Sequence, residues 1–319
     1  METIPCLFCH RQRHTVVIRE HGYSGVKCFA CGLIYLSPRP TASEIWHLYN
    51  PAEAATLAPP LTNYRRFTGF VKSLPARYTT AIIKTYLPAG RLLEIGPGDG
   101  HFLATFQKAG FTVSGLEVNR RRAEFIRTGL KIPCLSEPLS HPVWNRKSFD
   151  LIYHRDVLSH FSDPLKEFHL MHQRLDAGGF LGFETGNLAD VEEKYYAAFP
   201  TFDYPEHLFF FGRQSLARLL GLTGFEVAAI YNYSILPTLY LEKYIARRRL
   251  KKRQGRTPSL PAAPPASPVT ARPGLKNYLK KSILTLYDLL SEYFLKYRLG
   301  RLLPKSGRPQ TLIVVARKR

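Results

Sequence analysis

The chain is poor in acidic residues, has only five cysteines and contains no long apolar run. No stretch approaches the ~18–20 apolar residues of a membrane-spanning helix, and the first residues, METIPCLFCH, lack the basic and apolar regions of a secretory signal. A composition of 45% hydrophobic and 22% charged residues over 319 positions excludes disorder and collagen-like repeats. These absences predict a folded, cytoplasmic protein with a sizeable core.

The shortage of acidic residues is confined to one part of the chain. The formal net charge is +21, and residues 243–319 contain 20 Lys and Arg but only 2 Asp and Glu, a net charge of +18. Residues 1–242 therefore carry only +3. A surface built throughout to hold nucleic acid is not indicated, whereas the basic block suits a local contact with a phosphate-rich surface.

Four of the five cysteines form two C-x2-C pairs, Cys6 with Cys9 and Cys28 with Cys31. Each pair can present two thiolates to one cation, and four sulfurs at tetrahedral positions suit Zn²⁺. Two disulfides, or a site that has lost its metal, are the alternatives, and the lack of a secretory signal argues against disulfides. We therefore expect one structural Zn²⁺ with four protein ligands. Cys134 stands alone and is expected to be a small buried hydrophobic residue.

After this module the apolar pattern alternates between short strands and helices. Strands are expected at residues 91–95, 112–117, 132–135, 149–153, 179–184, 225–231 and 311–316. Helices are expected at residues 42–49, 64–86 with a break at Pro75, 101–109, 120–128, 163–175 and 213–222. Strands that alternate with helices of about ten residues predict an α/β domain with a mostly parallel sheet.

Residues 232–310 interrupt this alternation. A cationic run at 247–253 leads into a linker, 254–274, that is rich in Pro, Ala and Ser. Residues 275–303 have the spacing of an amphipathic helix, with cations such as Lys296 at its ends and an apolar face formed by Leu279, Ile283, Leu286, Leu290, Tyr293 and Tyr297. Two interpretations stay open: the helix packs on the domain or on another subunit, or the 243–305 block contacts anionic lipid at the inner face of the membrane.

A glycine-rich turn follows the strand expected at 91–95. It reads Glu94-x-Gly96-x-Gly98-x-Gly100 and opens a helix. Glycines let the backbone approach a ligand, and a helix N-terminus offers unpaired N–H groups. Glu117 ends the next strand, 23 residues after Glu94, where a carboxylate can accept both ribose hydroxyls of an adenosine cofactor.

At these motifs the sequence resembles the class I S-adenosylmethionine-dependent methyltransferases. The resemblance continues in five further segments, at residues 149–152, 156–164, 175–179, 185–187 and 207–211. The sequence departs from the family at Ser159, where Glu is usual, and at Gly186, where many members have Pro. The resemblance implies a Rossmann-like, doubly wound, seven-stranded sheet that binds S-adenosylmethionine.

The same resemblance implies a set of site residues. The residues implied in cofactor binding are Glu94, Gly96, Gly98, Gly100, Glu117, Val118, Glu137, His154 and Arg155. Tyr64, Arg65 and Arg66 are candidates to cover the cofactor. A nucleophile should attack the sulfonium methyl group while the protein aligns the reacting atoms. A base is needed only where the acceptor has a proton to lose, and the catalytic candidates are His160, His154, Asp156 and His207. A hydrogen bond at the entry of a helix is the alternative role of His160.

The N-terminal part resembles a narrower group. The segment from Cys28 to Tyr35, with Pro38-Arg39-Pro40 after it, is similar to the zinc-ribbon methyltransferases that act on sugars and surface polysaccharides in bacteria. This implies a zinc ribbon at 1–40, a methyltransferase domain at 41–231 plus 311–319, and the basic insert at 232–310.

The implied acceptor is a small molecule, such as a sugar or a lipid-linked glycan in cell-surface polysaccharide biosynthesis. The residues do not choose between C-, O- and N-methylation, and they specify no oligomeric state. Two alternatives stay open: an RNA methyltransferase with a zinc-finger substrate module, and a catalytically silent cofactor-binding protein. The low charge of residues 1–242 and the lack of an N-P-P-Y type tetrapeptide argue against RNA.

Overall fold

The computed structural model describes residues 1–49, 73–254, 286, 289–303 and 306–319. The strands are β1 (His14–Glu20), β2 (Tyr23–Cys28), β3 (Ile34–Leu36), β4 (Arg91–Ile95), β5 (Thr112–Leu116), β6 (Cys134–Leu135), β7 (Phe149–Arg155), β8 (Leu175–Gly186), β9 (Phe209–Phe210), β10 (Phe225–Ser234) and β11 (Gln310–Lys318). The α-helices are α1 (Ala42–Tyr49), α3 (Leu74–Lys84), α4 (His101–Lys108), α5 (Arg120–Gly129), α6 (Pro164–Arg174), α7 (Arg213–Leu222), α8 (Leu236–Gln254) and α10 (Gly300–Leu302). Short 3₁₀ turns are η2 (Pro142–Trp144), η3 (Leu158–His160), η4 (Leu188–Asp190) and η5 (Glu193–Ala198), and η6 (Leu289–Leu299) is π-helical. Within these ranges no helix is long and apolar enough to cross a membrane.

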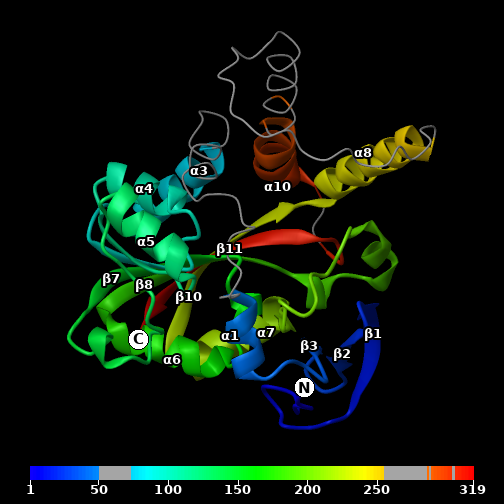
Figure 1. The fold of residues 1–319 in the computed structure, drawn as a ribbon, viewed down its shortest axis with the longest axis horizontal. Coiled ribbons are helices and arrows are strands. Elements are labelled where there is room, and N and C mark those ends of the chain that lie inside the picture. The colour runs from blue at the N-terminus through cyan, green and yellow to red at the C-terminus, as the bar shows by residue number, and fades with distance from the viewer. Residues whose placement is uncertain (50–72, 255–285, 287–288, 304–305) are drawn as a thin grey trace, which may run out of the picture.

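The larger of two sheets has seven strands in the order β10-β11-β8-β7-β4-β5-β6. Strands β8, β7, β4, β5 and β6 are parallel, and β11 runs antiparallel between β8 and β10. Helices cover both faces, with α6 and α7 on one and α3 and α4 on the other (Figure 1). This confirms the predicted fold class, a Rossmann-like, doubly wound α/β sheet.

The alternation of side chains along each strand divides the core between these two faces. On one face Leu93 and Ile152 pack with residues of α6 and α7, and on the other Leu92 and Leu151 pack with residues of α3, α4 and α5. The buried Cys134 belongs to the second group, as its isolation in the sequence predicted. Because these strands are buried on both faces, their sequences are apolar at successive positions, as at Leu92-Leu93 and Leu151-Ile152.

Several strands extend beyond the expected bounds. β7 continues to Arg155, and β10 continues to Ser234, which pairs with Gln310 of β11. Residues 232–234 and 310, which the sequence assigned to the insert, therefore lie in the sheet. Because Ser234 pairs with Gln310, the insert between β10 and β11 is shorter than expected and comprises residues 235–309.

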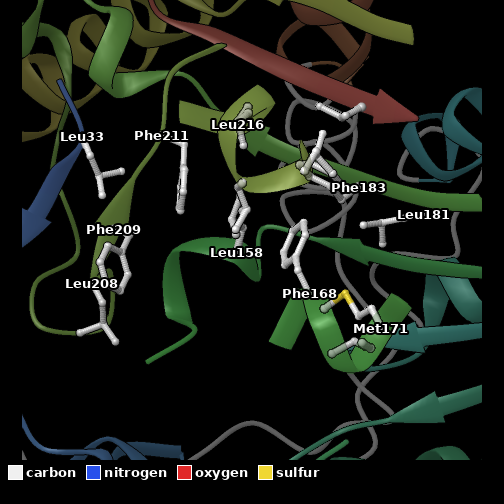
Figure 2. Close-up of a cluster of buried hydrophobic side chains, with 14 of the residues drawn as sticks. Leu33, Leu158, Phe168, Met171, Leu181, Phe183, Leu208, Phe209, Phe211 and Leu216 are labelled. Carbon is white, nitrogen blue, oxygen red and sulfur yellow. The ribbon is translucent and has the colours of Figure 1, made fainter. Parts of the chain in front are cut away.

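The N-terminal module is joined to the domain through the smaller sheet, of order β1-β2-β3-β9. Its β3 pairs antiparallel with β9, a strand more than 170 residues further along the chain. Figure 2 shows Leu33 of the module in the same cluster of buried side chains as Phe209, Phe211 and Leu158. Module and domain therefore share one hydrophobic core.

The insert differs from its expected form. The cationic run 247–253 continues α8, which projects from the body in Figure 1. The described end of the predicted amphipathic helix is η6, where Leu290 is exposed but Tyr297 is buried. Leu286, which lies before η6, is exposed as well. A π-helix has a wider turn than an α-helix, so residues three positions apart, such as Leu290 and Tyr293, no longer share one face. The 255–274 linker, most of 275–288 and Tyr64, Arg65 and Arg66 lie outside the described residues.

Candidate functional site

The predicted glycine turn follows β4, and its three glycines have positive φ angles of 67°, 57° and 79°. A Cβ at Gly96 would lie 2.6 Å from Val157 Cγ2, and a Cβ at Gly100 would lie 2.7 Å from Leu130. A Cβ at Gly98 would have no heavy atom within 4 Å. Gly96 and Gly100 therefore allow tight packing, whereas Gly98 leaves open space beside the turn.

Glu117 follows β5 and is held in place by the backbone. Its Oε2 accepts a hydrogen bond from the Gly98 N–H at 2.8 Å, and its Oε1 accepts one from Asn119 at 2.9 Å. Burial raises the pKa of this carboxyl, although the Asn119 N–H opposes the shift. Each oxygen has a further lone pair, so the fixed carboxylate can accept from a ligand.

Glu94, in β4, is a buried carboxyl beside the same turn. It is only 2% exposed, and its Oε2 has no hydrogen-bond partner. Burial raises the pKa of Glu94 to about 8, against the opposing charge of Arg155. A buried acceptor without a partner is costly in a folded protein, and it marks a place suited to a ligand cation.

A cavity of about 400 Å³ lies over this region. Gly96, Gly98, Glu117 and Val118 line its floor, and α1 contributes Ala42, Ile45 and Trp46. A lobe of about 210 Å³ beside it is lined by Glu94, Asp99, His101 and Arg155, among others. We call the two together the first cavity. It lies beyond the carboxyl ends of β4, β5 and β7, where open α/β sheets bind their ligands.

A second cavity of about 240 Å³ lies beyond β8. Its wall is aromatic and includes Phe199, Phe202, Phe209, Phe210 and Phe211, while its polar groups include Thr185, Asn187, Asp203, His207 and Gln310. Asp156 lines both cavities and has an unusual positive φ of 54°. Its side chain is 63% exposed, so it stands where the two cavities meet.

Two catalytic candidates, His160 and His207, form a pair with ring centroids 4.7 Å apart. His160 lines the first cavity and His207 the second. His160 Nδ1 lies 3.1 Å from the Glu206 carbonyl oxygen, and His207 Nδ1 lies 3.0 Å from that of Phe202. Burial and the neighbouring His207 lower the pKa of His160 to about 4. Since a carbonyl only accepts, the Nδ1–H of each ring is the donor in these two contacts.

His154 is placed in the core, which corrects its assignment to catalysis and cofactor binding. It is fully buried, and its ring stacks on Phe183 at 5.0 Å. Burial lowers its pKa to about 3, so the ring is neutral. The cause is the length of β7: because the strand runs to Arg155, His154 falls on the same face as Ile152, beneath α6.

Two further cofactor candidates do not line the first cavity. Gly100 is the N-cap of α4 and faces Leu130. Glu137 does not line the cavity, whereas the two residues after it, Pro138 and Leu139, do. Sequence reasoning also missed several lining residues. These are Trp46, Asp99, His101, Leu139 and Arg122 of the first cavity and the aromatic wall of the second. Arg122 could have been found, because it stands in the first turn of the helix after Glu117.

The first cavity fits S-adenosylmethionine by the chemistry of its groups. The unpartnered Glu94 carboxyl suits an ammonium group, and the Arg155 guanidinium suits a carboxylate. The fixed Glu117 carboxylate suits ribose hydroxyls. Apolar side chains such as Ile95, Leu116 and Leu139 leave room for a flat, largely apolar base.

The four N-terminal cysteines converge. Their ligand atoms all lie within 4.8 Å of one another, with the sulfurs of Cys6 and Cys31 3.4 Å apart and those of Cys9 and Cys28 3.5 Å apart. All four are free thiols, and the structure holds no disulfide among the described residues. The N–H groups of Ala30 and Cys31 lower the pKa of Cys28 to about 7, although burial opposes this. This donor set fits a tetrahedral metal ion.

Comparison with known proteins gives one family match. Residues 67–230, just over half of the chain, match the family described as methyltransferase domain. Over 103 residues the chain is 27% identical to the ubiquinone biosynthesis O-methyltransferase of Vibrio parahaemolyticus. That match covers 30% of this chain and 44% of the relative, so it spans less than half of the relative's length.

The chain is also similar to solved structures at low sequence identity. The [4+2]-cyclase SpnF has a TM-score of 0.51 and 16% identity, over 88% of this chain and 97% of that chain. An O-methyltransferase from a trans-AT PKS multienzyme of Brevibacillus brevis, in complex with S-adenosyl-L-homocysteine, has a TM-score of 0.48 and 13% identity. That likeness covers 88% of this chain and 82% of the other.

The family match and the geometry concern the same residues. The matched segment holds β4, β5 and β7, whose carboxyl ends build the floor of the first cavity. The first cavity fits S-adenosylmethionine on the chemistry of its own side chains. Because the family model covers more than half of the chain, the chain belongs to the methyltransferase domain family.

Proposed function

We propose that the enzyme methylates a hydroxyl group of a small acceptor bound in the second cavity. The observation that carries the proposal is the meeting of the two cavities at Asp156, with His207 on the acceptor side. When bound, S-adenosylmethionine supplies an electrophilic methyl group. This chain's residues hold the acceptor oxygen at the junction and receive its proton.

His207 is the proposed base. Its Nδ1–H donates to the Phe202 carbonyl, which leaves Nε2 as the proton acceptor of a neutral ring in the acceptor cavity. Asp156 is the proposed partner at the junction, because its exposed carboxylate can orient a hydroxyl. His160 supports the pair through its ring contact with His207.

The proposed acceptor class is a sugar or a lipid-linked glycan of cell-surface polysaccharide biosynthesis. Aromatic rings with interspersed amide and hydroxyl groups suit a molecule with apolar faces and several hydroxyls. The printed name of the relative from Vibrio parahaemolyticus supports transfer to oxygen. The sequence resemblance to sugar-modifying enzymes supports the acceptor class.

We also propose that residues 1–40 form a zinc ribbon with one structural Zn²⁺ on Cys6, Cys9, Cys28 and Cys31. The four thiols leave no open coordination position, so the ion would fold the module and take no part in the reaction. The module reaches the second cavity, because β3 pairs with the β9 residues of its wall. Glu20 of β1 also binds the cavity loop, accepting from the N–H groups of Phe202 and Tyr204 at 2.9 Å.

The test is mass spectrometry of the purified chain with S-adenosylmethionine and fractionated cell extract. A sugar or glycan fraction should gain one methyl group. His207→Gln should lose this product but keep its affinity for S-adenosylhomocysteine. The matched variant His169→Gln, at an exposed position of α6 that lines neither cavity, should keep both. A methylated RNA fraction would support the RNA alternative, and cofactor binding without any methylated product would support the silent alternative.

A second proposal concerns the basic insert, which we propose contacts an anionic lipid surface. Leu286, Leu290 and Phe294 are 65%, 41% and 51% exposed, and they follow one another at four-residue steps. Tyr240 and Tyr244 of α8, which packs beside η6, are about half exposed. Exposed apolar groups in and beside the block 243–319, which has a net charge of +18, suit an interfacial contact.

Liposome co-sedimentation tests this contact. The enzyme should pellet with anionic vesicles, and less so at high salt. Replacing Leu286, Leu290 and Phe294 by Gln should abolish pelleting, while Leu222→Gln, an equally exposed site on α7, should not. Equal sedimentation of the two variants would contradict the proposal.

A further inference from the structure

Residues 289–303 lie outside the segment that matches the family, yet they dock firmly onto the sheet. Tyr297 is 1% exposed, and its ring lies 4.8 Å from that of Tyr78 in α3 and 5.2 Å from that of Tyr233 in β10. At Gly300 a Cβ would lie 2.4 Å from the Ser234 carbonyl oxygen, so the backbones touch. The position of the neighbouring Lys296 is therefore fixed.

The ammonium group of Lys296 forms an ion pair with a buried carboxylate. Its Nζ lies 2.8 Å from Oε1 of Glu184, a residue of β8 with no exposed surface. The Tyr297 hydroxyl donates to the same Oε1 at 3.3 Å. Although burial opposes ionisation, Lys296 and Arg155 lower the pKa of Glu184 to about 2, so the carboxylate is charged. Lys296, which the sequence analysis assigned to the end of an amphipathic helix, thus lies inside the domain.

Arg155 is the second cation beside Glu184, but it is held less closely. Its Nε lies 3.5 Å from Glu184 Oε2 and 3.5 Å from Asp156 Oδ2, and this nitrogen makes no hydrogen bond. The guanidinium instead covers the ring of Phe102 at 5.0 Å and lines the first cavity. Because Lys296 and Tyr297 already satisfy Glu184, Arg155 is left facing the cavity.

We propose that Lys296 is a positioning residue for the cofactor: by binding Glu184 it keeps the Arg155 guanidinium turned to the first cavity, where that guanidinium binds the carboxylate of the cofactor. Without Lys296, the buried Glu184 carboxylate would have Arg155 as its one cationic partner among the described residues. Since an unpaired buried charge is strongly unfavourable, Arg155 would move toward Glu184 and away from the cavity. The insert would then tune cofactor affinity from outside the segment that matches the family. This role rests on the methyltransferase assignment and is independent of the acceptor class.

Calorimetric binding of S-adenosylhomocysteine tests the proposal. Lys296→Met should weaken the Kd about tenfold, the range expected for losing a hydrogen bond to a charged group. Lys296→Arg should restore most of the affinity. The double variant Lys296→Met/Glu184→Gln should bind like the wild type, because the neutral amide that replaces the Glu184 carboxylate no longer attracts Arg155. Arg298→Met, an exposed neighbour that contacts Tyr293, is the matched control and should leave the Kd unchanged.

Thermal unfolding of the ligand-free variants separates positioning from a structural role. If Lys296 served stability alone, the Kd of a folded Lys296→Met variant would equal that of the wild type, and this would overturn the proposal. A double variant that folds but binds as weakly as Lys296→Met would overturn it too. If Lys296→Met does not fold, wild-type affinity in the folded double variant supports the proposal. Wild-type protein that binds no S-adenosylhomocysteine would overturn the cofactor assignment itself, and this role with it.

Discussion

The two cavities are built from the chain in different ways. The first takes its floor from turns that each follow a parallel strand, so Gly96, Glu117 and Arg155 are placed by β4, β5 and β7. The second is enclosed by an irregular stretch, 185–211, backed by a strand from the N-terminal module and by one residue that opens β11. Both share Asp156.

This difference shows which of the two cavities depends on contacts between distant parts of the chain. We call the first cavity the cofactor half of the site and the second the acceptor half. The ends of β4, β5 and β7 fix the floor of the first cavity, and this floor should survive damage to the N-terminal module. The walls of the second cavity are held by contacts such as β3 with β9 and Glu20 with the loop at 201–204. Perturbations can therefore be chosen that affect one half and spare the other.

Loss of the proposed zinc ion should show the largest difference between the two cavities, because it should lower turnover and leave cofactor affinity unchanged. A Cys28→Ser/Cys31→Ser variant should lose about one equivalent of zinc by elemental analysis, because two of four ligands are gone. The displaced β3–β9 wall should lower turnover by about a hundredfold, the cost of small misplacements in an active site. S-Adenosylhomocysteine affinity should persist. Cys134→Ala is the control that should keep the metal, and metal-free wild type with an intact module would contradict the assignment.

Glu117→Ala should damage the first cavity alone. Loss of a charged acceptor costs ~1.5–3 kcal/mol, so the Kd for S-adenosylhomocysteine should rise about 10–100-fold by calorimetry. Glu124→Ala, an exposed carboxylate on α5, is the matched control. An unchanged Kd for Glu117→Ala would remove this carboxylate from the cofactor site.

Glu94 should make the first cavity sensitive to pH. Its pKa of about 8 lies above the ordinary 4.5, so the unfolding free energy that it contributes is present at low pH and is lost between pH 4.5 and 8. The ionised form suits an ammonium group, so affinity should rise with pH by up to about tenfold per unit in this range. Calorimetry in buffers of different ionisation enthalpy should show proton release on binding. Glu94→Gln should abolish it, and release that persists would assign the proton elsewhere.

Glu20→Gln should have the smallest effect and should act on the second cavity. Its carboxylate also accepts from Thr201 Oγ1 at 3.0 Å, so one side chain anchors the cavity loop at three points. Loss of the charge should weaken these bonds by ~1 kcal/mol and raise the acceptor KM about fivefold. Glu226→Gln, on the outer surface, is the control. A change in cofactor affinity would show that the halves are not separable.

The cofactor half could be predicted from the sequence because its determinants are local. A strand, a glycine turn and a helix stand in direct succession, and each leaves its own pattern. The misplaced His154 shows the limit of this reasoning. Side chains alternate along a strand, so an error of two residues in the end of β7 exchanged a core residue for a cavity residue.

The acceptor half could not be predicted, because its contacts join distant segments. Nothing near Phe209 signals that it will pair with Tyr35. The burial of Lys296 could not be predicted either, because it depends on Glu184, 112 residues earlier in the chain. A cation is read from sequence as solvated unless its partner is known.

The place of β11 in the sheet has a consequence for synthesis on the ribosome. β11 fills the gap between β8 and β10, but residues 235–309, a stretch of 75, are translated after β10 and before β11. At ~5–20 residues per second this delay lasts about 4–15 s. Throughout it β8 and β10 each present an edge of unpaired backbone N–H and C=O groups that can pair with another chain. Nascent copies on a crowded polysome should therefore depend on ribosome-associated chaperones until Lys318 has emerged.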